Sequence, residues 1–306
     1  MAIYKYVTQE RVDVFKNGCI RFSQPAALND PWEGHPNFQK LICQENLETV
    51  IIPKVLEQTT DKEVLNDVIA KVKKNFEELG LKITDSQLSL AVNQFISQTG
   101  KSLQQLRYEA MQEALDMFKQ AEPDVIESIP NIINDKFGVL SLTTNPSNEL
   151  MWSHYANSHA GMVIEFDPNH EFFASPQGFT EELHGLHQVV YADSPPPIVD
   201  IFALEHVGWA PMILIKSRCW VYEEEFRAIR PLKMADKIID VGDHPIHLYN
   251  VPPDCFKGVV FGSKMKPDVR SSIREEVKST GLYDHLHWSE AIGDSRSFQI
   301  QISRIL

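Results

Sequence analysis

Residues 3–22, IYKYVTQERVDVFKNGCIRF, have the pattern of a strand, a helix and a second strand. Aromatic and β-branched side chains dominate Ile3–Tyr6 and Cys19–Phe22, as is typical of short strands. Between them, Thr8 is placed to cap a helix, and Gly18 is placed to end it. The chain therefore opens with strands and a helix in one small unit.

Residues 40–135 differ in composition from the rest of the chain, because they contain no tryptophan and only two glycines. Apolar residues such as Leu103, Leu106 and Ala110 recur at three- and four-residue steps, which predicts about four amphipathic helices. Breaks are expected near Pro53, Gly80, Gly100 and Pro123. We expect residues 40–135 to be a helical insertion or cap without catalytic groups. Residues 1–39 and 136–306 would then form one mixed domain.

Strand patterns return after residue 136. The predicted strands are Val139–Leu142, Met162–Asp167, Val189–Tyr191, Cys219–Ile229, Gly258–Phe261 and Phe298–Ile305. The predicted helices are one opened by Asn145 and Pro146, one over Ile201–Lys216 and one over Lys266–Ser279. This order predicts an α+β fold, with a mixed or antiparallel sheet as its core and one large helical insertion.

Composition narrows the function classes. The formal net charge of −13 argues against a broad basic surface for duplex nucleic acid. The first residues lack the pattern of a signal peptide, and no apolar run reaches the roughly 18 residues that span a bilayer. The four cysteines are far apart in sequence, which favours reduced thiols. We therefore expect a cytoplasmic protein that does not bind membranes.

The segment NELMWSHYANSHAGMVIEFD, residues 148–167, concentrates aromatic and histidine side chains. Met151, His154 and Tyr155 share one helix face, and an aromatic and methionine stripe of this kind is usually core. His154 and His159 are five residues apart, a poor spacing for two metal ligands, so no metal is expected. On the following strand, Glu165 lies at the boundary of a packed face, where solvation or a salt bridge is the ordinary role.

The segment CWVYEEEFRAIR, residues 219–230, carries three successive glutamates. If it is one strand, Glu223, Glu225 and Arg227 share a face. They can form a solvated ladder of charges. They can equally form a site in which Arg227 orients one carboxylate and the other meets a substrate. Spacing alone leaves both interpretations open.

Four segments together resemble domain of unknown function family 2971, a group of mostly bacterial, uncharacterised proteins. They are IYKYVTQERVDVFKNGCIRFSQPAALNDPWEG, FGVLSLTTNPSNELMWSHYANSHAGMVIEFD, VVYADSPPP and WVYEEEFRAI. The resemblance implies a pocket whose polar residues are Lys5, Asn29, Asp30, Glu33, His154, Tyr155, His159, Tyr191, Glu223, Glu225 and Arg227. It covers both ends of the chain and says nothing about residues 40–135.

The order of elements is also similar to that of ADP-ribosyltransferases, with Glu223-Glu224-Glu225 in place of their late E-x-E motif. This likeness implies that NAD is the cofactor and that Glu223, Glu225 and His154 are catalytic. It also implies that an aromatic residue, Tyr4, Tyr155 or Tyr191, stacks on nicotinamide. The chain departs from that pattern at Lys5, where a histidine or an arginine is usual, and it has no Ser-Thr-Ser strand.

Two other classes of function remain open. A metal-dependent hydrolase or nuclease would use Asp30, Glu33, His35, His154, His159 and Glu165 around a divalent ion. A non-catalytic sensing or regulatory module would bind a small ligand in the same pocket. On each interpretation we expect Ile3–Tyr6 and the strand near Trp220 to belong to one sheet or to flank one cleft. The expected partners are a small nucleotide-like molecule and a protein target.

Overall fold

The computed structural model describes residues 2–54, 66, 69–70, 73–74, 84–174, 183, 185–203, 210–242 and 244–305. The chain packs as two compact units. The first comprises Met1–Asn37, Ile129–Pro197 and His206–Leu306, and the second comprises Phe38–Ser128 and Ile198–Glu205. Among the described residues, no helix is both long and apolar enough to cross a membrane.

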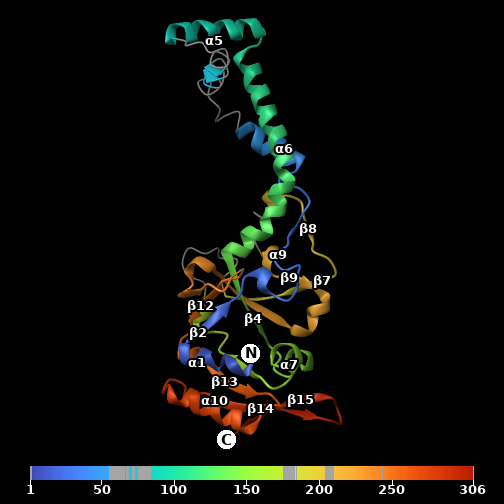
Figure 1. The fold of residues 1–306 in the computed structure, drawn as a ribbon. Coiled ribbons are helices and arrows are strands. Elements are labelled where there is room, and N and C mark those ends of the chain that lie inside the picture. Colours follow the sequence, from blue (N-terminus) through green and yellow to red (C-terminus); the bar gives the residue numbers. More distant parts are fainter. Residues whose placement is uncertain are drawn as a thin grey trace. The chain divides into compact units, whose positions relative to one another are not determined.

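An eight-stranded mixed sheet forms the centre of the first unit, in the order β15-β14-β13-β5-β1-β4-β10-β6 (Figure 1). Its strands are β1 (Ile3–Val7), β4 (Phe137–Thr143), β5 (Met162–Phe166), β6 (Leu186–Gln188), β10 (Glu225–Pro231), β13 (Phe256–Phe261), β14 (His287–Asp294) and β15 (Gln299–Ile305). Among these strands, β13 and β14 are the one parallel pair, and helix α10 (Pro267–Ser279) connects them. The predicted α+β class is confirmed, and β1 and β10 lie in one sheet as expected.

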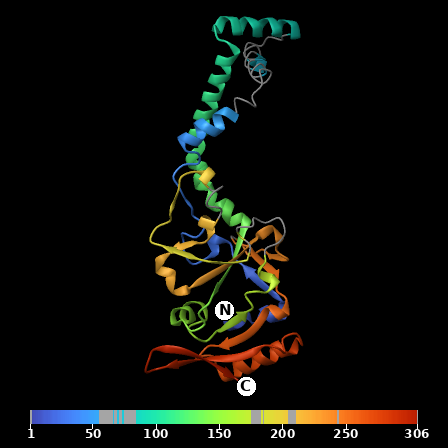
Figure 2. The same cartoon turned by 180° about the vertical axis from the view of Figure 1, so that it is seen from behind.

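The chain also forms smaller sheets. A three-stranded sheet has the order β11 (Lys237–Ile239), β12 (Ile246–Asn250) and β2 (Cys19–Phe22), and a parallel pair is formed by β7 (Val190–Ala192) and β9 (Ile215–Ser217). The short strands β3 and β8 cover Asn37–Phe38 and Pro197–Ile198. The other helices described in the first unit are α1 (Asp13–Asn17), α7 (Glu149–Tyr155) and α9 (Ala210–Ile213). Figure 2 shows the same unit from behind, with the β14–β15 hairpin and α10 again side by side.

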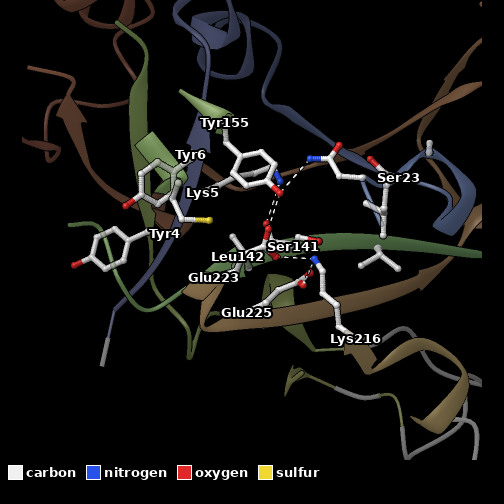
Figure 3. A pocket seen from close by; sticks show the side chains of 15 residues that line it. Tyr4, Lys5, Tyr6, Ser23, Ser141, Leu142, Tyr155, Lys216, Glu223 and Glu225 are labelled. Carbon is white, nitrogen blue, oxygen red and sulfur yellow. Dashed lines mark hydrogen bonds and ion pairs between the residues drawn. The ribbon is translucent and has the colours of Figure 1, made fainter. Parts of the chain in front are cut away.

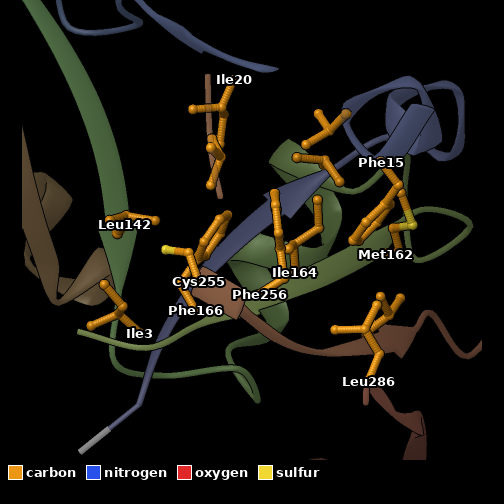
Figure 4. Close-up of a cluster of buried hydrophobic side chains, with 14 of the residues drawn as sticks. Ile3, Phe15, Ile20, Leu142, Met162, Ile164, Phe166, Cys255, Phe256 and Leu286 are labelled. Atoms are coloured by element: carbon orange, nitrogen blue, oxygen red, sulfur yellow. The ribbon is translucent and has the colours of Figure 1, made fainter. Parts of the chain in front are cut away.

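Alternation along the strands gives the sheet two apolar faces. Met162, Ile164 and Phe166 of β5 are fully buried in the larger core cluster, together with residues of α1 and α10 (Figure 4). Val163 points the other way and packs with Trp152 of α7 in a second cluster. The period-two pattern of β5 was therefore predicted correctly, and so was the packing role of Trp152.

Several predicted boundaries were wrong. Thr8 makes no capping bond: a 3₁₀ turn precedes α1, which does end at Gly18 in a left-handed conformation, φ 61°. Helix α7 is capped by Asn148, whose side chain accepts from the Met151 amide, and not by Asn145. The predicted helix over Ile201–Lys216 includes strand β9, because Lys216 pairs with Tyr191; residues 204–209 lie outside the described residues.

The largest correction concerns residues 219–224, which were predicted as strand. Arg218–Glu223 is a 3₁₀ helix, and Glu224 is left-handed with φ 46°. Strand β10 begins only at Glu225. The alternation of side chains along β10 therefore does not extend back across Glu224. Glu223 and Glu225 nevertheless both face inward, because the turn at Glu224 returns the chain to the sheet.

The second unit is helical. Its described elements include α2 (Gln44–Asn46), a π-helical turn (Leu47–Ile51), α5 (Asp85–Thr99) and most of α6 (Leu103–Lys136), whose residues from Ile129 onward belong to the first unit. Thr84 and Gln87 form a capping box at the start of α5, and Gly100 ends that helix as predicted. The predicted break at Pro123 does not occur, because α6 continues through that residue.

Candidate functional site

One pocket of the first unit brings together side chains from residues 4–29 and from residues 139–225 (Figure 3). The cavity has a volume of about 140 Å³. Its walls are formed by Tyr4, Lys5, Tyr6, Ser23, Ala27, Leu28, Asn29, Val139, Ser141, Leu142, Met151, Tyr155, Lys216, Glu223 and Glu225. Sites for whole drug-sized ligands usually measure about 300–1,000 Å³, so this cavity suits a single ring or a group of similar size.

The pocket opens where β1 and β2 diverge from β4. Tyr4 is paired with Thr143, whereas Ser23 forms an isolated bridge with Val139, with both backbone bonds at 2.8 Å. Ser141 lies between these two points on β4. Its carbonyl accepts a hydrogen bond from Lys5 Nζ at 3.0 Å. The Lys5 side chain thus bridges the gap between the two strands and leaves room beside it.

A buried ion-pair network forms the wall opposite Lys5, and Arg227 is at its centre. The guanidinium binds Glu33 through two nearly parallel bonds, Nη1 to Oε2 at 2.8 Å and Nη2 to Oε1 at 2.6 Å. It binds Glu225 through Nε at 2.8 Å and Nη2 at 3.1 Å, and it also donates to the Ile213 carbonyl. Arg227 and Glu225 are 1% and 2% exposed, so both charges depend on this pairing.

Lys216 of β9 links the carboxylates of the network to one another. Its Nζ lies 2.6 Å from Glu223 Oε2, 3.0 Å from Glu225 Oε2 and 3.5 Å from Glu33 Oε1. Its ammonium also lies over the Trp220 ring, 5.1 Å from the ring centre. Lys216 therefore holds the two pocket-facing glutamates together despite their like charges.

Glu223 connects the network to the rim of the pocket. The Tyr155 hydroxyl donates to Glu223 Oε1 at 2.5 Å and accepts from Asn29 Nδ2 at 3.1 Å. Tyr155 comes from the last turn of α7, and Asn29 is exposed. Glu223 is thus joined to the rim of the pocket through the Tyr155 hydroxyl, which Asn29 also binds.

The ion pairs determine the protonation states of the buried groups in the site. Burial alone would raise the pKa of Glu225, but Arg227, Lys216 and the Ser141 hydroxyl hold it at about 2. Burial likewise opposes the charged form of Lys216, yet the carboxylates of Glu225, Glu223 and Glu33 outweigh it and raise the Lys216 pKa. Glu225 and Lys216 are therefore both charged near neutral pH.

The pKa of Lys5 is shifted in the opposite direction to that of Lys216. Burial lowers the pKa of Lys5 to about 8, and the charges of Arg11 and Arg21 act in the same direction. The carboxylates of Glu225 and Glu223 oppose this shift without cancelling it. At neutral pH Lys5 is mostly charged, but it loses its proton far more readily than an ordinary lysine.

The loop before residue 35 is held by its own hydrogen bonds. Asp30, which is 3% exposed, accepts the Trp32 amide on Oδ1 at 3.0 Å and the Glu33 amide on its carbonyl at 3.1 Å. These bonds set the direction of the Glu33 side chain toward Arg227. Asp30 does not line the cavity, so its role in the structure is to fix the loop that carries Asn29 and Glu33.

The structure separates the other candidates from the cavity. His154 is exposed, with its ring 6.4 Å from that of Tyr222. His159 stacks on Trp152, and its Nε2 lies 3.2 Å from Ser153 Oγ; burial lowers its pKa. The Tyr191 hydroxyl accepts the Glu225 amide at 2.8 Å, so it fixes the start of β10 from behind. Burial raises the pKa of Tyr191 to about 12.

Of the predicted residues, Tyr4, Lys5, Asn29, Tyr155, Glu223 and Glu225 line the cavity, and Glu33, Arg227 and Tyr191 support it from behind. Sequence reasoning missed Lys216, Ser23 and Ser141. Lys216 ends the apolar run Met212–Ile215 shortly before the glutamates, and an isolated cation in that position was the available signal. Ser23 and Ser141 had no such signal.

The residues of the predicted metal site are dispersed. Glu33 binds Arg227, whereas Glu165 binds His287 at 2.9 Å on the far side of β1. In the described part of the chain, no three histidine, cysteine, aspartate or glutamate side chains are placed to hold a metal ion. The carboxylates of the pocket instead bind lysine and arginine.

The segment that carries most of this network also matches a known family. Residues 151–228 match the family model described as Protein of unknown function (DUF2971). The DUF2971 match covers about a quarter of the chain and includes Tyr155, Lys216, Glu223, Glu225 and Arg227. No curated protein and no solved structure matches the chain. The DUF2971 description carries no activity, so the pocket itself has to support any functional proposal.

Proposed function

We propose that the pocket binds the ribose ring of a nucleotide-like ligand, and that the chain is an enzyme that transfers the ADP-ribosyl group of NAD, as ADP-ribosyltransferases do. The observation that carries the proposal is the environment of Glu223. Its carboxylate lies on the cavity wall, is held by Lys216 and shares Oε1 with a tyrosine hydroxyl. A ribose hydroxyl can replace that tyrosine hydroxyl without leaving a buried carboxylate oxygen unpaired.

The two glutamates would have different roles. Both oxygens of Glu225 are occupied by Arg227, and one of them also binds Lys216. We therefore assign Glu225 to positioning and Glu223 to ligand contact. When the bond between nicotinamide and ribose breaks, its electron pair leaves with nicotinamide and the sugar becomes cationic. A fixed carboxylate beside the ring stabilises that cation until an acceptor hydroxyl bonds to the sugar carbon and releases its proton.

The size of the cavity supports ring binding. About 140 Å³ accommodates one ring, so the remainder of a dinucleotide would lie outside the cavity. Tyr4, Tyr6 and Tyr155 provide aromatic surface around the polar groups. An apolar wall with a few fixed polar groups is the usual composition of a small-molecule site.

The test is release of nicotinamide from NAD by the full-length protein, followed by chromatography. Glu223→Gln should slow release about a hundred- to thousandfold, the usual cost of losing one charge-stabilising group. Glu224→Gln is the matched control, because Glu224 is exposed and its side chain binds Asn145 instead. If the wild-type protein neither binds nor consumes NAD, the proposal is wrong.

The second candidate function is a sensing module. It is favoured by the hydrogen bonds that the Glu225 carboxylate already makes to Arg227 and Lys216. A carboxylate whose oxygens are already bonded suits a rigid binding pocket as well as it suits catalysis. On this alternative, NAD or a related ligand binds and raises the unfolding temperature, but no nicotinamide is released. The same experiment, with melting curves added, distinguishes the two.

A further inference from the structure

The gap between β1, β2 and β4 contains cations that the proposed ribose site does not use. Lys5 lines the cavity, and Arg21 of β2 lies two positions before Ser23, a lining residue that directly follows that strand. Because side chains alternate along a strand, Arg21 and Ser23 emerge on the same side. The electrostatic effect of Arg21 on Lys5 agrees with this placement.

Arg21 is incompletely bonded. Its Nε is buried, and it has no hydrogen-bond partner among the described residues. Burial and the charge of Arg11 both lower the pKa of Arg21. Arg11 has its own partner, Asp13, at 3.4 Å. A buried N–H without an acceptor costs free energy, and an incoming acceptor would remove that cost.

Lys5 also has spare hydrogen-bonding capacity. An ammonium carries three donors, and the structure shows one bond from Lys5, to the Ser141 carbonyl. Three negative charges in the network are balanced by three positive ones. The negative charges belong to Glu33, Glu223 and Glu225, and the positive charges to Lys216, Arg227 and Lys5. The charge of Arg21 is then in excess, in a chain whose formal net charge is −13.

We propose that Lys5 and Arg21 form a phosphate subsite beside the ring pocket, and that it binds the 5′-phosphate of the nucleotide-like ligand. The inference rests on the proposed function for the identity of the ligand, but the subsite is defined by its own residues. A phosphate oxygen would accept from Arg21 Nε and another from the Lys5 ammonium. A guanidinium and an ammonium together are a common phosphate-binding pair.

Nicotinamide mononucleotide and nicotinamide riboside differ by this one phosphate, and they provide the test. Calorimetric titration of the full-length protein, at constant ionic strength, should show about tenfold or more tighter binding of the mononucleotide. Arg21→Gln should abolish that difference and leave riboside affinity unchanged. Arg296→Gln, at a side chain that is 92% exposed, should preserve it. The subsite is wrong if the wild-type protein binds the mononucleotide and the riboside equally well, or if the difference in affinity remains in Arg21→Gln. Neither result would contradict the ribose proposal.

A second measurement does not depend on the folding of any variant. Inorganic phosphate should slow acetylation of Lys5 in the wild-type protein, followed by mass spectrometry, while leaving acetylation of Lys257, whose side chain is 42% exposed, unchanged. If Lys5 is protected but neither nicotinamide compound binds, the subsite is supported and the proposed function fails. If phosphate does not protect Lys5 and the mononucleotide binds no better than the riboside, the subsite is wrong.

Discussion

The Tyr155 hydroxyl lies 2.5 Å from Glu223 Oε1, and this contact joins α7 to the buried ion-pair network. The bonds continue from one residue to the next in the order Asn29, Tyr155, Glu223, Lys216, Glu225, Arg227 and Glu33. Asn29 and Glu33 belong to one loop, so the chain of bonds returns to the segment where it began. The loop is therefore held at both ends, and its position depends on the charges of the site.

Tyr155→Phe should destabilise the protein measurably. The change removes the donor to Glu223 and the acceptor of Asn29 while keeping the ring. Losing a hydrogen bond to a buried carboxylate costs about 1–3 kcal/mol of unfolding free energy. Urea denaturation measures that free energy, and Tyr108→Phe is a suitable control because Tyr108 is 57% exposed. Equal stabilities of the two variants would contradict the importance of this contact.

Arg227→Met should lower the free energy of unfolding more than Tyr155→Phe does. Methionine fills much of the arginine volume, but Glu33 and Glu225 lose their main partner and stay buried. Breaking a buried pair on one side costs about 3–5 kcal/mol. Arg218→Gln should cost about 0–1 kcal/mol, because Arg218 and Asp193 form an exposed pair. Denaturant unfolding compares both with the wild type. A loss below 1 kcal/mol for Arg227→Met would mean that the network does not stabilise the fold.

Low pH should reduce the free energy of unfolding, in part because Glu225 becomes protonated. Its pKa is about 2 in the folded protein, against about 4.3 for a glutamate in an unfolded chain. Since the folded value is depressed, the stabilisation is present above about pH 4.3 and is lost as the pH falls through about 2. Unfolding free energies measured between pH 2 and pH 5 should therefore fall less steeply for Glu225→Gln than for the wild type. Equal slopes would show that Glu225 takes no part in acid unfolding.

The strands of the sheet were predictable where alternation is regular. Residues Met162–Phe166 alternate between two buried faces, and a local pattern is sufficient to show it. The sequence also alternates through Trp220 and Tyr222, yet the chain there forms a 3₁₀ helix. The left-handed turn at Glu224 is the cause, and a non-glycine residue in that conformation leaves no pattern in the sequence.

The candidate site was predictable only in part, because its pairs are distant along the chain. Glu33 and Arg227 are 194 positions apart, and no periodicity relates them. The family resemblance placed both in one set, but it could not show that Arg227 supports the pocket from behind. His154 was misplaced for a related reason: a helical face shared with Tyr155 does not specify which of the two points inward. Lys216 was overlooked because residues 201–216 were interpreted as a helix.

Lys5 should react with acetic anhydride at a lower pH than ordinary lysines. Burial and the charges of Arg11 and Arg21 favour its neutral form, and its pKa is about 8, against about 10.4 in a model peptide. Since the folded value is depressed, the unfolded chain binds more protons between these values, and Lys5 adds stability as the pH rises from about 8 to 10. Pulse acetylation followed by mass spectrometry should give a midpoint near pH 8 for Lys5. Arg21→Gln should move that midpoint upward, because it removes one of the charges that lower it, whereas Arg296→Gln should leave it unchanged. A midpoint near 10 in the wild type would show that Lys5 is solvated, and the gap between β1 and β4 would then be open to water.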